Sequence, residues 1–115
     1  MRFFGSRQQA DADGFYETVA ETAVVAGQMT PARAAGKQIL LTRWDGALYA
    51  FAATCPHAAV SLADGEISRY KVVCPEHDYC FDVRNGRILW PEDELYRLPT
   101  FPVKVVAGKV WVQLS

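Results

Sequence analysis

The amino-acid sequence predicts an all-β protein, an antiparallel β-sandwich or small barrel. Short runs rich in apolar and β-branched residues recur along the chain, and several of them alternate apolar with polar positions. Turn dipeptides such as Asp-Gly and Asn-Gly separate these runs. No segment shows the apolar spacing of a convincing helix. Many short strands without helices are typical of sandwiches and barrels.

The expected strands begin at Phe15 and continue almost to the C-terminus. A first strand is expected over residues 15–19, followed by a connecting turn over 21–26. The later strands are expected at 37–44, 47–53, 70–74, 81–83, 101–105 and 110–114. The last two of these alternate in hydrophobicity, which indicates that one face of each strand is buried.

Three dipeptides are expected to join neighbouring strands. Asp45-Gly46 lies between the two longest runs and is a strong signal for a tight hairpin. Asn85-Gly86 is expected to form another turn of the tight hairpin type, and Ala107-Gly108 to join the last two strands. The first hairpin leads directly into residues 54–80, where the chemically distinctive side chains gather.

Length and composition predict one domain. Residues 1–14 offer little to bury and are expected to form a flexible N-terminal tail, and residues 15–115 to form the domain. At 115 residues the chain is long enough for a modest core. Half of its residues are hydrophobic and 22% are charged, which is ordinary for a globular protein.

Charge and hydropathy exclude several classes of function. The net charge of -1 leaves no basic footprint for nucleic acid. No apolar run approaches the ~18 residues of a membrane span, and the N-terminus lacks the apolar segment of a secretory signal. A glycine-rich phosphate loop is also missing. We therefore expect a cytoplasmic protein that binds neither nucleic acid nor nucleotide cofactors.

The chain is organised around a pair of Cys/His motifs. One residue separates Cys55 from His57, two separate Cys74 from His77, and sixteen lie between the motifs. Both histidines of the chain and two of its three cysteines fall in these motifs. A proline follows each cysteine and favours a turn, which lets the cysteine and the histidine reach one centre. The four side chains are therefore candidate metal ligands.

Two kinds of metal centre accept mixed thiolate and imidazole ligands. One is a tetrahedral zinc ion, and the other is a two-iron, two-sulfur cluster with cysteines on one iron and histidines on the other. Zinc fingers usually pair cysteine with cysteine and histidine with histidine, whereas here each loop offers one of each. That arrangement suits a binuclear centre, because each loop can send its thiolate to one iron and its imidazole to the other. Zinc remains the alternative.

The third cysteine, Cys80, is left over by this assignment. It has no partner for an internal disulfide, which fits a reducing compartment. A fifth ligand is chemically conceivable at this position. We expect instead a small residue packed at the start of a strand.

Residues 54–80 resemble the Rieske iron-sulfur motif, which reads Cys-x-His, about sixteen residues, then Cys-x-x-His. The resemblance covers roughly residues 15–114. It implies a β-sandwich base with an inserted cluster-binding subdomain, about residues 54–92, made of two ligand loops and a proline loop. Further matches to the family lie at 62–65, 81–86 and 89–91. The last is the proline loop and should place Trp90 near the cluster.

The same resemblance implies a role for each motif residue. Cys55 and Cys74 would bind the buried iron of one Rieske-type [2Fe-2S] cluster, and His57 and His77 would bind the outer iron. Neither loop carries the extra cysteine or the serine of respiratory Rieske proteins, so the chain resembles the soluble, oxygenase-associated ferredoxin branch. Asp78 and Ala59 stand where many relatives have glycine.

The expected function is a one-electron carrier and not an enzyme. Two protein ligands and two bridging sulfides fill each iron, which leaves no open position for a substrate. The resemblance implies a flavin-containing ferredoxin reductase as electron donor and a terminal oxygenase as acceptor. The alternatives are the small redox subunit of a larger reductase, such as a nitrite-reductase-like complex, and a zinc-stabilised binding module. Eight acidic against four basic residues over 54–95 predict an acidic cluster end.

Overall fold

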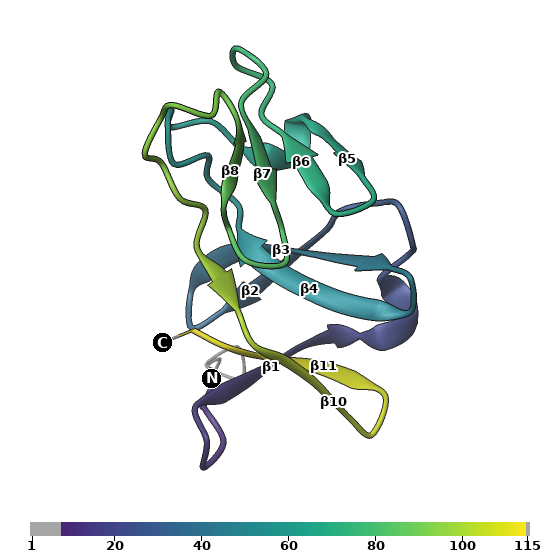
Figure 1. Cartoon of the computed structure of the whole chain (residues 1–115). Coiled ribbons are helices and arrows are strands. Elements are labelled where there is room, and N and C mark those ends of the chain that lie inside the picture. The colour runs from purple at the N-terminus through teal and green to yellow at the C-terminus, as the bar shows by residue number, and fades with distance from the viewer. Residues whose placement is uncertain (1–7, 115) are drawn as a thin grey trace.

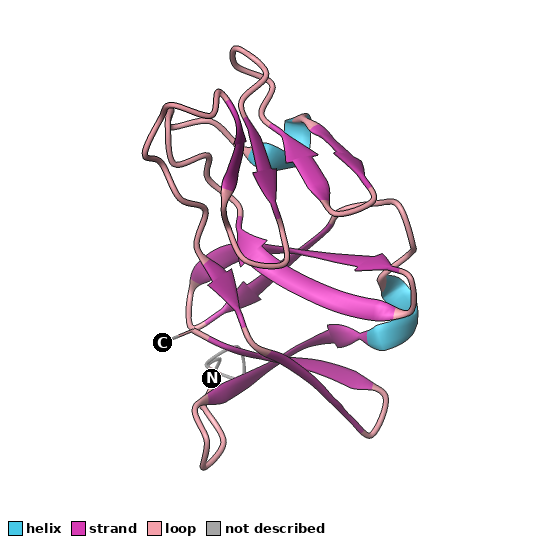
Figure 2. Cartoon of the chain, in the orientation of Figure 1, coloured by secondary structure: helices cyan, strands magenta, loops and turns pink. Residues whose placement is uncertain are grey.

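A computed structural model describes residues 8–114, and within that range every strand pair is antiparallel (Figures 1 and 2). The strands are β1 (Phe15–Ala20), β2 (Thr30–Ala34), β3 (Lys37–Trp44), β4 (Ala47–Ala52), β5 (Glu66–Ser68), β6 (Lys71–Val73), β7 (Cys80–Asp82), β8 (Ile88–Trp90), β9 (Thr100–Phe101), β10 (Val103–Val106) and β11 (Lys109–Gln113). Two short 3₁₀ helices, η2 (Glu21–Ala23) and η3 (Leu62–Asp64), lie between strands. The predicted all-β class is confirmed.

The strands form three sheets that are stacked along the molecule (Figure 1). One sheet has the order β1-β11-β10, the middle sheet has the order β2-β3-β4-β9, and the third has the order β5-β6-β7-β8. The first two sheets make up the sandwich-like base. The third sheet is inserted between β4 and β9. One Cys/His motif lies in the connection that leads from β4 to this sheet, and the other lies between its strands β6 and β7.

Strand β3 separates two hydrophobic cores. Ile39 and Leu41 are buried with Val110 and Val112 of β11 in the core of the base. Leu40, between them, is buried on the opposite side, in the core that contains the two motif cysteines. Successive side chains of a strand point to opposite faces, so a strand with a core on each side reads as a continuous apolar run.

Two of the predicted hairpins are confirmed. Asp45 and Gly46 have φ of 54° and 80°, and Ala107 and Gly108 have φ of 51° and 78°. Positive φ at both central residues is the signature of the two-residue type I′ turn, whose twist matches that of the flanking strands. The pairs β3–β4 and β10–β11 therefore form directly from neighbouring segments.

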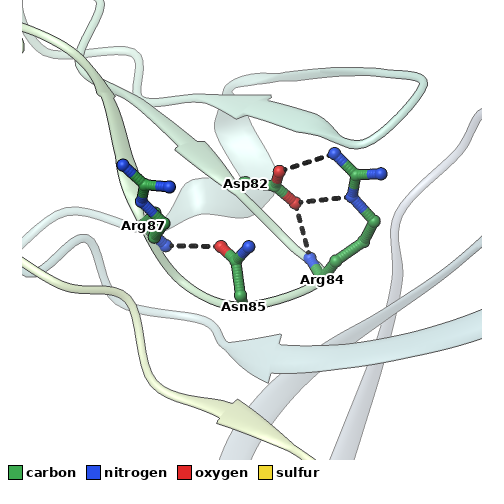
Figure 3. A network of polar contacts seen from close by, with 4 residues as sticks. All are labelled: Asp82, Arg84, Asn85 and Arg87. Atoms are coloured by element: carbon green, nitrogen blue, oxygen red, sulfur yellow. Dashed lines mark hydrogen bonds and ion pairs between the residues drawn. The ribbon is translucent and has the colours of Figure 1, made fainter.

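The connection at Asn85-Gly86 is longer than the predicted tight turn. Five residues separate β7 from β8, and Asp82 holds them (Figure 3). The Asp82 carbonyl accepts the Gly86 N–H at 2.7 Å, and its carboxylate accepts the Arg84 backbone N–H at 2.9 Å. Asp82 thus accepts the backbone N–H groups of both Arg84 and Gly86, and these two hydrogen bonds hold a turn that is wider than a two-residue hairpin.

Strand β2 was not expected from the sequence. It contains Pro31, which cannot donate a ladder hydrogen bond and so weakens the strand signal. Within the described chain β2 pairs with β3 alone, so Pro31 lies on an edge strand, where proline is tolerated. Ala35 and Gly36, with φ of 52° and 79°, form the turn between the two strands.

The N-terminal segment is described from residue 8 onward, and residues 1–7 of the predicted tail lie outside the described residues. The side-chain amide of Gln8 donates to the carbonyls of Glu17 in β1 and Arg33 in β2, two strands that do not pair with each other. The flexibility of the tail and the domain boundary at residue 15 stay predictions. Between residues 8 and 114, neither helix has the length and apolar character required to cross a membrane.

Candidate metal centre

Both Cys/His motifs lie at the end of the molecule formed by the β5–β8 sheet (Figure 1). The first motif lies between β4 and η3, and the second between β6 and β7. Both loops close in the same way. The N–H of Cys55 donates to the carbonyl of Val60 at 2.9 Å, and the N–H of Cys74 to that of Tyr79 at 2.7 Å. Each cysteine is thus tied through its backbone to the residue five positions later.

The second ligand loop contains two non-glycine residues in the left-handed region. His77 has a φ of 64° and Asp78 a φ of 59°. A Cβ disfavours this region by roughly 1–2 kcal/mol, because it approaches the next carbonyl oxygen. Asp78 is a position at which the family resemblance predicts glycine, and its backbone explains that preference. Ala59, the other such position, has no positive φ, so its backbone demands no glycine.

The two cysteines lie in the core, and the two histidines lie nearer the surface. Cys55 is 2% exposed and Cys74 is fully buried. His57 is half-buried, and its Nδ1 lies 3.0 Å from the Cys55 sulfur. The donor atoms of Cys55, His57 and Cys74 all lie within 4.8 Å of one another. His77 is outside this group and exposed, but the centroid of its ring lies 6.1 Å from that of His57.

The buried position of Cys74 suits a thiolate that binds a cation. Burial raises the pKa of the Cys74 thiol to about 11, although its sulfur accepts the backbone N–H of Glu76 at 3.4 Å. A bare thiolate is therefore unfavourable here, and a positive metal centre is what would stabilise the charged form. The two cysteine thiols are buried, and the two histidine rings lie nearer the surface. This arrangement fits a centre with one buried and one outer metal ion.

An aromatic residue that the sequence did not single out covers this site. The Tyr79 ring stacks on the His57 ring, with centroids 3.7 Å apart and planes 4° from parallel. Its hydroxyl donates to the Glu94 carboxylate at 2.8 Å, which raises the pKa of Tyr79 to about 12. No pattern in the sequence predicts this stacking, because Tyr79 and His57 belong to different loops.

The proline loop, expected at 89–91, continues through residue 97, and this segment lies beside the ligand loops. Its Tyr96 ring is 6.0 Å from the His57 ring and 6.0 Å from the Tyr79 ring. The ring centroid of Trp90, at the start of the loop, lies 6.4 Å from that of Tyr79, and its expected place near the cluster stays a prediction. Cys80 opens β7 and is not part of the donor group found in the described chain.

The fold and the motifs together correspond to a known family. A family model described as a Rieske [2Fe-2S] domain matches residues 14–102. The chain belongs to this family. Membership decides between the two metal centres that the motif spacing left open. The cofactor of this Rieske domain is a [2Fe-2S] cluster and not a structural zinc ion.

Relatives of this Rieske domain occur in chains of very different length. The ferredoxin component of the naphthalene 1,2-dioxygenase system of Pseudomonas aeruginosa is 34% identical over 70% of this chain and 76% of its own length. Human apoptosis-inducing factor 3 is 35% identical over 77% of this chain, but the match spans only 14% of that protein. The same domain therefore occurs as a small protein and as part of a large one.

Solved structures show the same fold. A chain from the complex of reduced oxygenase and oxidised ferredoxin in carbazole 1,9a-dioxygenase is 25% identical, with a TM-score of 0.78 over 87% of this chain and 93% of that chain. The ferredoxin of carbazole 1,9a-dioxygenase from Nocardioides aromaticivorans IC177 has a TM-score of 0.79 at 22% identity. The predicted resemblance to Rieske-type ferredoxins is confirmed, since the family model matches and relatives of the chain are named as ferredoxin components of dioxygenase systems.

Proposed function

We propose that this Rieske domain carries single electrons from a flavin-containing reductase to a terminal oxygenase in the cytoplasm. Its cluster ligands are Cys55, His57, Cys74 and His77. The observation that carries the proposal is the gathering of three of these donors within 4.8 Å at one end of a Rieske fold. The fourth, His77, lies in the same loop as Cys74, and the centroid of its ring is 6.1 Å from that of the His57 ring.

The division of ligands follows from burial. Cys55 and Cys74 lie in the core and would hold the inner iron away from water, whereas His57 and His77 lie nearer the surface and would hold the outer iron. When bound, the cluster supplies a one-electron couple, whose potential is raised when two imidazoles replace two thiolates. Because the two imidazoles lie nearer the surface than the two cysteines, they would be the ligands closest to a partner.

The relatives support the proposed partners. Ferredoxin components of naphthalene 1,2-dioxygenase and alkene monooxygenase systems are among them. The carbazole 1,9a-dioxygenase complex contains an oxygenase and a ferredoxin, and one of its chains shares this fold. A small carrier in such a system needs an electron donor as well as an acceptor. A flavin-containing reductase meets that need because a flavin can release electrons one at a time.

A second candidate function is a redox domain that works inside a larger assembly. It is favoured by one observation, the match to 14% of human apoptosis-inducing factor 3. Copurification separates the two functions. A chain isolated with a large enzymatic subunit in fixed stoichiometry would support the second, whereas a freely exchanging carrier would support the first.

The ligand assignment is tested by electron paramagnetic resonance of the reduced protein. We expect the spectrum of a cluster with mixed cysteine and histidine ligands, and its loss or strong change in His77→Ala. A spectrum typical of four-cysteine clusters, or an unchanged spectrum in the variant, would remove His77 from the ligand set. Failure of the wild-type protein to take up one electron would overturn the proposed function itself.

A further inference from the structure

The surface beside the ligand loops carries an unusual concentration of exposed apolar side chains. Leu95 is 97% exposed, Trp90 is 53% exposed and Tyr96 is 41% exposed. We call these three residues the proline-loop patch. Scattered apolar residues are normal on a protein surface, but a contiguous apolar group usually marks a contact with another molecule. Trp90 and Tyr96 both border the Tyr79 ring, and Leu95 directly precedes Tyr96 in the chain.

The proline-loop patch adjoins the side chain through which the electron would leave. The Tyr96 ring lies 6.0 Å from that of His57. A protein seated on the patch would therefore lie against the histidine side of the site, where the path for electron transfer is short. This step depends on the proposed function, because it takes His57 as a ligand of the outer iron.

The charges around the patch indicate what kind of partner fits it. Glu92 and Asp93 are exposed, and no hydrogen bond or ion pair within residues 8–114 engages their carboxylates. The one base of this loop, Arg97, donates to the carbonyl of Asn85 at 2.9 Å and is thereby held toward the β7–β8 turn. The patch is thus bordered by unpaired negative charge.

We propose that the proline-loop patch is the docking surface for a redox protein that offers an apolar recess rimmed by lysine or arginine. Leu95 enters the recess, and Trp90 and Tyr96 cover its edges. Glu92 and Asp93 face the basic rim. Apolar contact determines how long the complex lasts, and the opposite charges determine how fast it forms. In the complex the reduced cluster loses one electron and the partner gains it, without transfer of a proton or a group.

Cytochrome c is a suitable probe, because its exposed haem edge lies in an apolar surface surrounded by lysines. The protein is reduced, and its oxidation by ferric cytochrome c is followed by stopped flow over a range of ionic strengths. Ferricyanide serves as a small oxidant that needs no docking surface. For each variant the ratio of the two second-order rate constants is compared, so that docking is separated from the intrinsic reactivity of the cluster.

We expect Leu95→Ser to lower this ratio about tenfold, a typical loss for a central interface residue. The matched control is Val106→Ser, since Val106 is 46% exposed but lies on the β10–β11 hairpin at the other end of the molecule (Figure 1). It should leave the ratio unchanged. The double variant Glu92→Gln, Asp93→Asn should weaken the fall of the rate with added salt.

The outcomes separate two failures. A wild-type protein that takes up no electron would overturn the proposed function. A protein that reacts with ferricyanide but shows equal ratios for Leu95→Ser and wild type would overturn the docking surface alone. A reaction with cytochrome c that is indifferent to salt would overturn the basic rim. Because Leu95 is almost fully exposed, its replacement leaves the core intact.

Discussion

Arg84 forms a two-point ion pair with the carboxylate of Asp82 in the loop between β7 and β8 (Figure 3). Its Nε donates to Oδ1 at 3.1 Å and its Nη2 to Oδ2 at 2.8 Å. The same guanidinium lies 4.0 Å from the centroid of the Tyr70 ring, which meets Tyr49 of β4 edge to face. The ion pair therefore connects the cluster-bearing sheet to the middle sheet of the base.

Removal of the Asp82 carboxylate should destabilise the protein. Asp82→Ala loses the acceptor for the Arg84 backbone N–H as well as the ion pair, and we expect the free energy of unfolding to fall by about 2 kcal/mol. Asp82→Asn keeps one acceptor and should cost less, since Arg84 is half exposed and water screens the pair. Urea denaturation measures both. Glu66→Gln, an exposed change on β5, is the control.

The same carboxylate predicts a loss of stability in acid. The hydrogen-bonded Arg84 holds the pKa of Asp82 below its ordinary value. The unfolded chain therefore binds the proton more readily, and the contribution of Asp82 is present above the unfolded pKa and lost as pH falls through the folded pKa. We expect the difference in unfolding free energy between wild type and Asp82→Asn to shrink between about pH 5 and pH 2. A constant difference would contradict this assignment.

Gly86→Ala should be far more costly than Gly36→Ala. Both glycines have φ near 80°, so both substitutions impose a similar backbone penalty of about 1–2 kcal/mol. A Cβ on Gly86 would also lie 2.1 Å from the carbonyl oxygen of Leu98, whereas a Cβ on Gly36 would meet nothing within 4 Å. Thermal unfolding compares the stability of the two variants, and the difference between them measures the effect of the close contact between a Cβ at position 86 and the Leu98 carbonyl oxygen. Equal losses of stability in the two variants would show that the backbone at Leu98 can shift to accommodate the added Cβ.

Cys80→Ser should keep the cluster and its colour. The Cys80 sulfur lies 3.3 Å from the Asp78 carbonyl, outside the donor group of Cys55, His57 and Cys74. Visible absorption and iron content of the purified variant should match those of the wild type. A colourless variant with normal far-ultraviolet circular dichroism would make Cys80 a ligand.

The reduction potential should lie in the lower half of the Rieske range, which runs from about -150 to +300 mV. Hydrogen bonds to the cluster sulfurs stabilise the added electron and raise the potential. Neither ligand loop carries the serine donor of respiratory Rieske proteins, and the Tyr79 hydroxyl donates to Glu94. Protein-film voltammetry measures the value. A potential in the upper half would mean that other donors replace the missing serine.

The features that depend on neighbouring residues were predicted from the sequence. The hairpin at Asp45-Gly46 follows from the φ values that this dipeptide accepts. The candidate ligands were recognised from their spacing, because each pair must turn within one or two residues. The structure adds the reason why the paired loops match, the hydrogen bond from each cysteine to the fifth residue after it.

The features that depend on distant residues could not be predicted. Pro31 weakens the strand pattern of β2 in the sequence. The proline is tolerated because β2 lies at the edge of its sheet, which the sequence does not reveal. The stacking of Tyr79 on His57 joins two loops that are far apart in sequence. The exposure of Leu95 could not be read from the sequence either, because half of the leucines in this chain are buried and exposure is a property of the whole fold.

The division of β3 between two cores limits how the ligand-bearing segment can be engineered. Leu40 of β3 and Phe51 of β4 lie in the same core as Cys55 and Cys74, yet both belong to the base. Residues 54–92, cut out and moved to another scaffold, would leave behind the apolar side chains on which their cysteines rest. Transplantation of the redox centre therefore requires β3 and β4 as well, so the smallest portable unit is nearly the whole described chain.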